Sequence, residues 1–357
     1  LTVSRTSNLL RAIETLFGVS IAQWRYYTFM ASVKLPWDGV WEALWRAIPS
    51  PLVDGRLLLV LDDSINPKTG QRIFACQRTF DHAAKRNHTR WPWAQTLVTV
   101  GLLKPIHGRW SCVPLAFAFY LRRQTLRAGC VRLRGRALVF ADKFAQAVGL
   151  IARLGACFRQ VPVLVVTDSW FGNNGLFKPL RARLGERAHL LSRLRVNAAL
   201  YARPAPQPGK PGRPRKYGTR LGSAATLAAA LRAQAQTYTL HVYGAWREVL
   251  AAEQVVMLKT LRCPVRVVWV YRKTQWVALM TTDLALSVEQ IIEYYSARWK
   301  IGVSGEGHLI QSVEVRPRPK DSSLVAWEAP WRESKTVEPS DKVRALAYSN
   351  VPGCNVQ

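Results

Sequence analysis

The stretch that decides the fold reads LLLVLDDS and covers residues 57–64. A run of five branched apolar residues is typical of a strand that is buried on both faces. A second stretch of the same kind, VLVVTDSW, covers residues 163–170. In both stretches aspartate follows the apolar run, as Asp62 and Asp63 in the first and as Asp168 in the second. Since α/β proteins place their sites at the carboxyl ends of their strands, we expect these carboxylates to meet at one edge of a sheet.

Carboxylates on adjacent strands repel each other unless a divalent cation or a raised pKa relieves them. The pattern therefore predicts a functional site, in a chain that has only 22 Asp and Glu among 357 residues. A purely structural alternative remains open. In that alternative Asp62 and Asp63 begin a turn, and Asp168 caps the helix that follows it.

The charge of the chain indicates its partner. Lys and Arg number 51, so the net charge is +29. Residues 302–357 hold seven basic and seven acidic residues, which leaves the whole excess in residues 1–301. A field of this size favours a polyanion, and nucleic acid is the expected one. The alternative is that codon bias in a GC-rich genome raises the arginine content.

Composition also excludes some classes of protein. No run approaches the roughly 18 apolar residues that a membrane span needs, so we expect no membrane partner. The six cysteines are scattered without a Cys-x-x-Cys pair, which argues against a zinc site.

The segments of the chain differ in periodicity and composition. Residues 1–50 are expected to be helical, and tryptophan recurs there every fourth residue at Trp37, Trp41 and Trp45. This stripe favours a packing face, with a base-stacking platform as the alternative. We expect five segments: N-terminal helices (1–50), the first part of an α/β domain with a mixed sheet (51–194), a β-rich insertion with a basic Pro/Gly loop (195–284), a C-terminal helix (285–301) and a poorly ordered tail (302–357).

Local signals predict further elements within these segments. Ser287 followed by Gln290 is the pattern of a helix that begins with a capping box. The other predicted helices cover residues 141–158 and 223–235. The other predicted strands cover residues 95–103, 111–121, 189–194, 238–243, 254–261, 264–271 and 276–282.

Three segments together resemble a known family. These are DS at residues 63–64, TDSWFGN at residues 167–173 and YYSARWKI at residues 294–301. In this order they are similar to the landmarks of the DDE transposases of bacterial insertion sequences. The resemblance covers roughly residues 50–301, and it is closest to the branch with a β-rich insertion between the second Asp and the Glu. It implies a ribonuclease H-like fold.

The resemblance also implies a chemistry. In such enzymes three carboxylates hold two Mg²⁺ ions, with Mn²⁺ as an alternative, and the metals activate a water and later a DNA 3′-hydroxyl. By resemblance Asp63 is the first ligand, because a hydroxyl residue follows it directly, and Asp168 is the second. Asp62 is the alternative first ligand, although strand alternation should point Asp62 and Asp63 to opposite faces.

The third carboxylate departs from the family pattern. The family signature runs Tyr, two residues, Arg, three residues, Glu, six residues, Lys. Tyr295 and Arg298 match this signature, but Gly302 stands at the glutamate position and Leu309 at the lysine position. A substitution at Gly302, together with a frameshifted or decayed C-terminus, would explain the mismatch.

Two nearby glutamates are weak substitutes for the missing ligand. Glu306 lies one helical turn after the expected position, about 5–6 Å along the axis if the helix continued. Glu293 lies nine residues before that position, on the opposite side of the helix.

Several residues are candidates for contacts with DNA. Tyr295 and Arg298 are candidates by resemblance. A basic Gly-Arg-Pro segment predicts either an arm in the minor groove of A·T-rich DNA or a loop that touches phosphates nonspecifically. Its basic candidates are Arg213, Arg215 and Lys216. Arg90 lies in a basic segment near the first Asp, and Trp170 would stack on a flipped base unless it packs in the core.

The sequence as a whole predicts a DNA transposase that cleaves and transfers strands at the ends of an insertion sequence. It predicts double-stranded DNA as the partner, in the form of transposon terminal repeats, and a homodimer is compatible with it. The expected location is the bacterial cytoplasm, in association with the nucleoid. Because of Gly302 we expect the activity of this copy to be impaired. The alternatives are a catalytically inactive, transposase-derived DNA-binding protein and a basic structural or RNA-binding protein without a carboxylate site.

Overall fold

The computed structural model of the chain describes residues 36–70, 73–82, 84, 87–128, 132–133, 136–205, 215–243 and 245–301, with isolated positions before residue 36. The predicted tail, residues 302–357, and most of the first predicted segment lie outside the described residues. In the described residues no helix is both long enough and apolar enough to cross a membrane.

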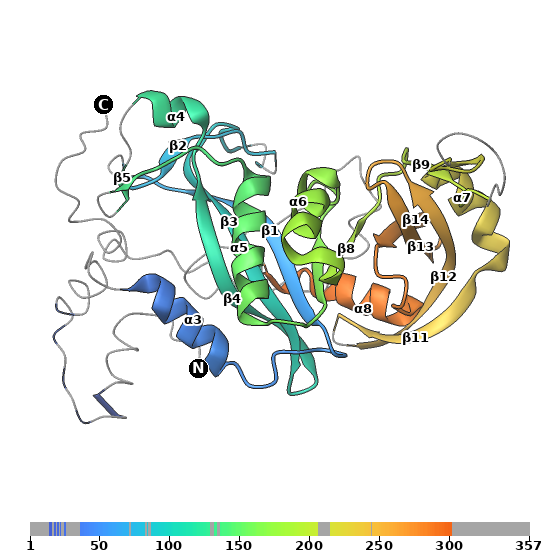
Figure 1. The fold of residues 1–357 in the computed structure, drawn as a ribbon, viewed down its shortest axis with the longest axis horizontal. Coiled ribbons are helices and arrows are strands. Elements are labelled where there is room, and N and C mark those ends of the chain that lie inside the picture. Colours follow the sequence, from blue (N-terminus) through green and yellow to red (C-terminus); the bar gives the residue numbers. More distant parts are fainter. Residues whose placement is uncertain are drawn as a thin grey trace.

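The described residues form an α/β fold with six α-helices and a large mixed sheet (Figure 1). The helices are α3 (Trp37–Ala47), α4 (Arg123–Ala128), α5 (Lys143–Cys157), α6 (Asn174–Leu184), α7 (Ala224–Leu231) and α8 (Val288–Ala297). The strands of the first half are β1 (Leu57–Pro67), β2 (Cys76–Arg78), β3 (Trp93–Ile106), β4 (Arg109–Tyr120), β5 (Arg132–Leu133), β6 (Arg136–Ala137), β7 (Val163–Thr167) and β8 (Ala188–Arg193). Those of the second half are β9 (Ala199–Tyr201), β10 (Arg220–Ser223), β11 (Gln236–Val242), β12 (Ala245–Leu258), β13 (Cys263–Arg272) and β14 (Gln275–Thr281).

The centre of the sheet has the ribonuclease H-like arrangement that the resemblance implied. Its strands lie in the order β4, β3, β1, β7, β8. The pairs β4–β3 and β3–β1 are antiparallel, whereas β1–β7 and β7–β8 are parallel. The apolar runs of β1 and β7 are buried throughout, as predicted for strands covered on both faces.

The strands of the expected insertion extend the same sheet. β14 pairs with β8, and β13, β12, β9 and β10 follow in order beyond it. β12 is longer than the predicted strand 254–261, because its first half pairs with β11 along the whole of that strand. Sequence periodicity cannot detect such pairing between strands.

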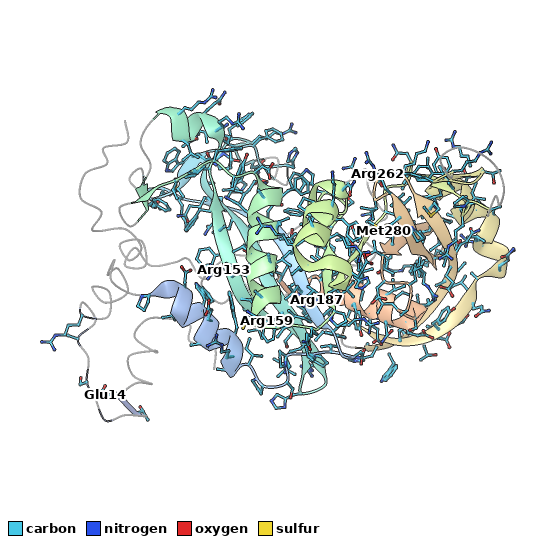
Figure 2. The ribbon with its side chains drawn as sticks, viewed as in Figure 1. Glu14, Arg153, Arg159, Arg187, Arg262 and Met280 are labelled. Carbon is cyan, nitrogen blue, oxygen red and sulfur yellow. The ribbon has the colours of Figure 1, made fainter. Side chains whose placement is uncertain are left out.

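Two apolar layers cover the sheet. On one face α5, α6 and α7 pack on alternate residues of the strands, and Trp45 of α3 joins this layer. On the other face α8 packs on the intervening residues. Asp38 of α3 and Arg153 of α5 form an ion pair, with 3.0 Å between Oδ1 and Nη2, that connects two helices of the first layer (Arg153 is labelled in Figure 2).

The predicted tryptophan stripe contributes to packing at two of its positions. Trp45 is buried, and its Nε1 donates to the carbonyl oxygen of Leu115 at 2.8 Å. Trp41 meets the ring of Phe117 edge-on, with 6.4 Å between ring centroids. The side chain of Trp37 lies outside the described residues.

The predicted capping box at Ser287 is also present. Ser287 accepts a hydrogen bond from the Gln290 backbone N–H, and the Gln290 side chain accepts one from the Ser287 backbone N–H, so the capping box begins α8 as predicted. The helix ends at Ala297, earlier than predicted, and a turn at Arg298 precedes helical backbone at residues 300–301.

Candidate functional site

The first aspartates lie within a strand rather than just beyond one. β1 continues to Pro67, and Asp62 and Asp63 pair with Thr99 and Val98 of β3. The sequence predicted that the strand would end before them, because polar residues follow the apolar run. The long antiparallel partner β3 extends β1 past the end of β7, where the two aspartates are half-buried.

Alternation along β1 sends the two aspartates to opposite faces. Leu58 and Val60 belong to the apolar layer under α8, whereas Leu59 and Leu61 belong to the layer under α5 and α6. Asp62 continues the first row and Asp63 the second. The alternation that the sequence suggested is therefore present in the fold.

Asp168 lies on the side of Asp62. β1 and β7 pair in a constant register, from Leu57 with Val163 to Leu61 with Thr167. The next residue of each chain segment is Asp62 after Leu61 and Asp168 after Thr167, so the same register brings these two residues next to each other. Val166, two residues before Asp168, belongs to the layer under α8. The structure thus differs from the expectation that Asp63 would be the neighbour of Asp168, and the reason is the two-residue period of the strand.

The electrostatics of Asp62 agree with this placement. Burial raises the pKa of Asp62, Arg298 lowers it, and the charges of Asp168 and Asp63 raise it again. The result is a pKa of about 6 instead of 3.8. Two carboxylates on adjacent strands therefore do repel each other here, and burial is the largest cause of the rise.

The end of α8 brings the two matching residues of the signature to this pair. Arg298 is 5% exposed, and its Nη1 donates to Asp62 Oδ2 at 3.1 Å. Its guanidinium lies 4.3 Å from the centroid of the Trp299 ring and 5.5 Å from that of Tyr295. Burial is the main reason why the pKa of Tyr295 is raised, and the charge of Asp168 also raises it. Asp62, Asp168, Tyr295 and Arg298 thus form one cluster, which we call the α8-face cluster.

Asp63 takes part in a different group on the other face. The ammonium of Lys143, the first residue of α5, donates to its carboxylate. Lys143 Nζ also lies 5.4 Å from the ring centroids of both Tyr120 and Trp170. Trp170 stacks on Phe144, with centroids 4.7 Å apart and an interplanar angle of 9°.

The two aromatic residues beside Asp168 have different environments. Phe171 is fully buried in the core, whereas Trp170 is 42% exposed. Phe171 therefore packs in the core, whereas Trp170 keeps part of its ring open to solvent.

Asp168 organises a turn and does not cap a helix. Its Oδ1 accepts hydrogen bonds from the backbone N–H groups of Trp170 and Phe171, whereas Asn173 is the N-cap of α6. The turn packs so closely on β8 that a Cβ at Gly172 would overlap the Oγ of Ser192. Glycine is required there by this close approach.

The remaining candidates lie apart from the α8-face cluster or outside the described residues. Arg90 is exposed, and its carbonyl oxygen accepts from the Asp81 N–H in the connection between β2 and β3. Arg215 and Lys216 are exposed at one end of the basic loop. The Glu293 carboxylate accepts a hydrogen bond from the His241 backbone N–H of β11. It therefore points toward β11 and not toward the two aspartates. Outside the described residues lie Arg213, Gly302, Glu306 and Leu309.

Sequence reasoning missed two basic residues, one that acts on Tyr295 of the α8-face cluster and one that pairs with Asp63. Arg193 ends β8 one residue after Ser192, the partner of Thr167, and its charge lowers the pKa of Tyr295 against the rise that burial causes. Its position could have been predicted, because a basic residue at the end of an apolar strand is a candidate site residue. Lys143 had no comparable signal, because only the packing of α5 brings it to Asp63.

The donor set of the α8-face cluster suits a divalent cation. Carboxylate oxygens are hard ligands, and the two carboxylates of Asp62 and Asp168 lie close enough for the charge of Asp168 to raise the pKa of Asp62. Asp62 and Asp168 would hold the ion. Among the described residues, however, no group of three His, Cys, Asp or Glu side chains is placed to hold a metal.

Comparison with known families shows the family of the chain. A family model described as "DDE superfamily endonuclease" matches residues 6–255, well over half of the chain. The match includes Asp62 and Asp63 of β1 and Asp168 after β7, and it ends within β12, before α8. No curated protein gives a significant match. Endonucleases of this superfamily act on DNA and generally use divalent metal ions. The chain belongs to the DDE superfamily endonucleases, as a protein of the DDE transposase type.

Proposed function

We propose that this chain is a DNA transposase that acts at the ends of an insertion sequence, with Asp62 and Asp168 as its metal-binding carboxylates. The observation that supports this best is the register of β1 and β7, which sets these two side chains on one face beneath Tyr295 and Arg298. Asp62 replaces Asp63 as the first ligand in this proposal, because Asp63 faces Lys143 on the other side of the sheet.

Two Mg²⁺ ions, or Mn²⁺ in their place, would supply a nucleophilic hydroxide and stabilise the charge of the displacement at phosphorus. Asp62 offers its ligand oxygens from β1, and Asp168 offers its own directly after the end of β7, where hydrogen bonds from the Trp170 and Phe171 N–H groups fix its carboxylate. Arg298 and Tyr295 lie on the same face, where a guanidinium and a hydroxyl are suited to bind phosphate oxygens of the strand to be cleaved. Arg193 adds a further positive charge at the end of β8.

The basic surface would bind the double-stranded terminal repeats. In our proposal Arg90, Arg213, Arg215 and Lys216 contact the phosphates or the minor groove, and Trp170 stacks on an unpaired base. The five predicted segments, from residues 1–50 to residues 302–357, remain our division of the chain, with residues 195–284 as a DNA-binding insertion. A homodimer associated with the bacterial nucleoid completes the proposal.

The test of the carboxylate assignment is Mg²⁺-dependent nicking of a duplex that carries the terminal repeat of the encoding element, with each variant made in a Gly302→Glu background so that the parent chain nicks. Asp62→Asn and Asp168→Asn should abolish nicking, whereas Asp63→Asn should retain it, because that carboxylate lies on the opposite face. If Asp63→Asn abolished nicking and Asp62→Asn retained it, the assignment would be reversed.

A second candidate function is a catalytically inactive DNA-binding protein derived from a transposase. Gly302, which stands where the family has a glutamate, favours it. This candidate predicts that the unaltered chain binds the terminal repeat with a steep salt dependence but does not nick it in Mg²⁺ or Mn²⁺. Binding of Mn²⁺ that is lost in Asp62→Asn would then identify a site that is retained without catalysis.

A further inference from the structure

Two consecutive aspartates carry two separate ion pairs. Asp62 pairs with Arg298 from the end of α8, and Asp63 pairs with Lys143 from the start of α5. The two basic residues come from helices on opposite faces of the sheet. Only the first of these pairs involves a carboxylate that lies beside Asp168.

Arg298 is held firmly against Asp62. Its side chain is 6% exposed and is packed against the rings of Trp299 and Tyr295. Its Nη1 donates to Asp62 Oδ2, while its buried Nε has no hydrogen-bond partner among the residues that the structure describes. The guanidinium is therefore fixed beside the carboxylates by packing and charge, with one donor left unused.

A divalent cation bound by Asp62 and Asp168 needs carboxylate oxygens in the volume that this guanidinium borders. Arg298 already directs its positive charge at Oδ2 of Asp62. Two positive charges on one carboxylate repel each other, and this repulsion is stronger beside the buried guanidinium than in water, so the oxygen that pairs with Arg298 is a poorer metal ligand. The released guanidinium would, in turn, have a free fork of donors for a phosphate.

We infer that Arg298 is a resident counter-ion that competes with the divalent cation for Asp62. This inference rests on the proposed function, because it takes Asp62 as a metal ligand. Cation binding then requires Arg298 to leave Oδ2, so the chain without DNA binds the cation more weakly than its two carboxylates alone would.

The test measures Mn²⁺ affinity from the electron paramagnetic resonance signal of the free ion, at one ionic strength and pH 7.5. Arg298→Gln keeps hydrogen-bond donors at the position but removes the charge, and it should lower the Kd about tenfold, equivalent to ~1.4 kcal/mol. Lys143→Gln is the matched control on the other face, and its Kd should stay within about twofold of the unaltered chain. Arg298→Lys keeps the charge and should bind Mn²⁺ no more tightly than the unaltered chain.

A measurement on the unaltered chain does not depend on the folding of a variant. Saturating Mn²⁺ should speed the hydrogen exchange of the backbone amides at residues 298–301, because Arg298 loses its anchor on β1. Exchange that slows or stays the same would contradict the competition.

The outcomes separate the inference from the proposed function. If Asp62→Asn abolishes Mn²⁺ binding while Arg298→Gln leaves the Kd unchanged or raises it, Arg298 is not a competitor, and the metal-site proposal stands. If Lys143→Gln tightens binding as much as Arg298→Gln does, only net charge is at work and the inference fails. If Asp62→Asn binds Mn²⁺ like the unaltered chain, the proposed site itself is wrong.

Discussion

Removing the carboxylate of Asp62 should stabilise the folded chain at neutral pH, although it should destroy the proposed metal site. The pKa of Asp62 is raised from 3.8 to about 6 in the fold, chiefly by burial, and Arg298 offsets only part of this rise. At neutral pH the folded state therefore holds an ionised carboxylate in surroundings that favour the protonated form. The amide introduced by Asp62→Asn would resemble that protonated form in shape and polarity.

The size of the effect follows from linkage. A difference between 3.8 and 6 corresponds to ~3 kcal/mol of free energy of unfolding. Because the Asp62 side chain is 33% exposed, solvent screening reduces our expectation to ~1–2 kcal/mol. The folded state binds this proton more tightly than the unfolded chain does. The contribution of Asp62 to stability is thus greatest below pH 3.8 and is lost as the pH rises through about 6.

Urea denaturation of both proteins in EDTA at pH 4.5 and pH 7.5 measures the effect. About a third of the effect is already present at pH 4.5, which lies above the unfolded pKa of 3.8. Relative to the unaltered chain, Asp62→Asn should therefore gain ~1 kcal/mol between pH 4.5 and pH 7.5, and it should be more stable by ~1–2 kcal/mol at pH 7.5. Asp63→Asn is the control, and at pH 7.5 it should be less stable by ~1 kcal/mol because Lys143 loses its partner. The contrary result would be a stability difference, variant minus unaltered chain, that falls between pH 4.5 and pH 7.5. In that case the ion pair with Arg298 would outweigh burial and the repulsion from Asp168, and our reasoning would fail.

Three further predictions concern packing, DNA and catalysis. Gly172→Ala should lower the free energy of unfolding by ~1–3 kcal/mol in urea, because the new Cβ would overlap the Ser192 Oγ. In a plot of the logarithm of the DNA association constant against the logarithm of salt concentration, the slope should be about −0.9 for each phosphate that the protein neutralises. Arg215→Ala should make this slope less steep by ~0.9, which corresponds to one phosphate contact. Gly302→Glu should restore Mg²⁺-dependent nicking only in part, because Leu309 still stands at the lysine position; robust nicking by the unaltered chain that Glu306→Gln abolished would instead make Glu306 the third ligand.

Local signals were enough to predict much of the fold. The apolar runs in β1 and β7 and the capping box of α8 each depend on residues that are close together in the sequence. A local pattern is therefore enough to predict them. The end of β1 was not predictable in this way. Asp62 and Asp63 read as the start of a turn, and only the pairing with β3, more than 30 residues later in the chain, keeps them in the strand.

The same limit applies to the site. Strand alternation predicted that Asp62 and Asp63 face opposite sides, but it could not say which side Asp168 would share. That choice depends on the register between β1 and β7 and on the placement of α8. The partners of the two aspartates are equally non-local, since Lys143 is 80 residues from Asp63 and Arg298 is 236 residues from Asp62.

The contrast between the two ion pairs is itself an argument about function. Asp63 and Lys143 form a pair of one negative and one positive group, which is sufficient for a structural role. Asp62 has Arg298 as its partner, yet its pKa stays raised, because burial and the nearby charge of Asp168 outweigh that one guanidinium. An arrangement that serves stability alone would replace one of these carboxylates with a neutral side chain. Both carboxylates instead lie on one face of the sheet, which supports our proposal that a bound cation supplies the missing positive charge.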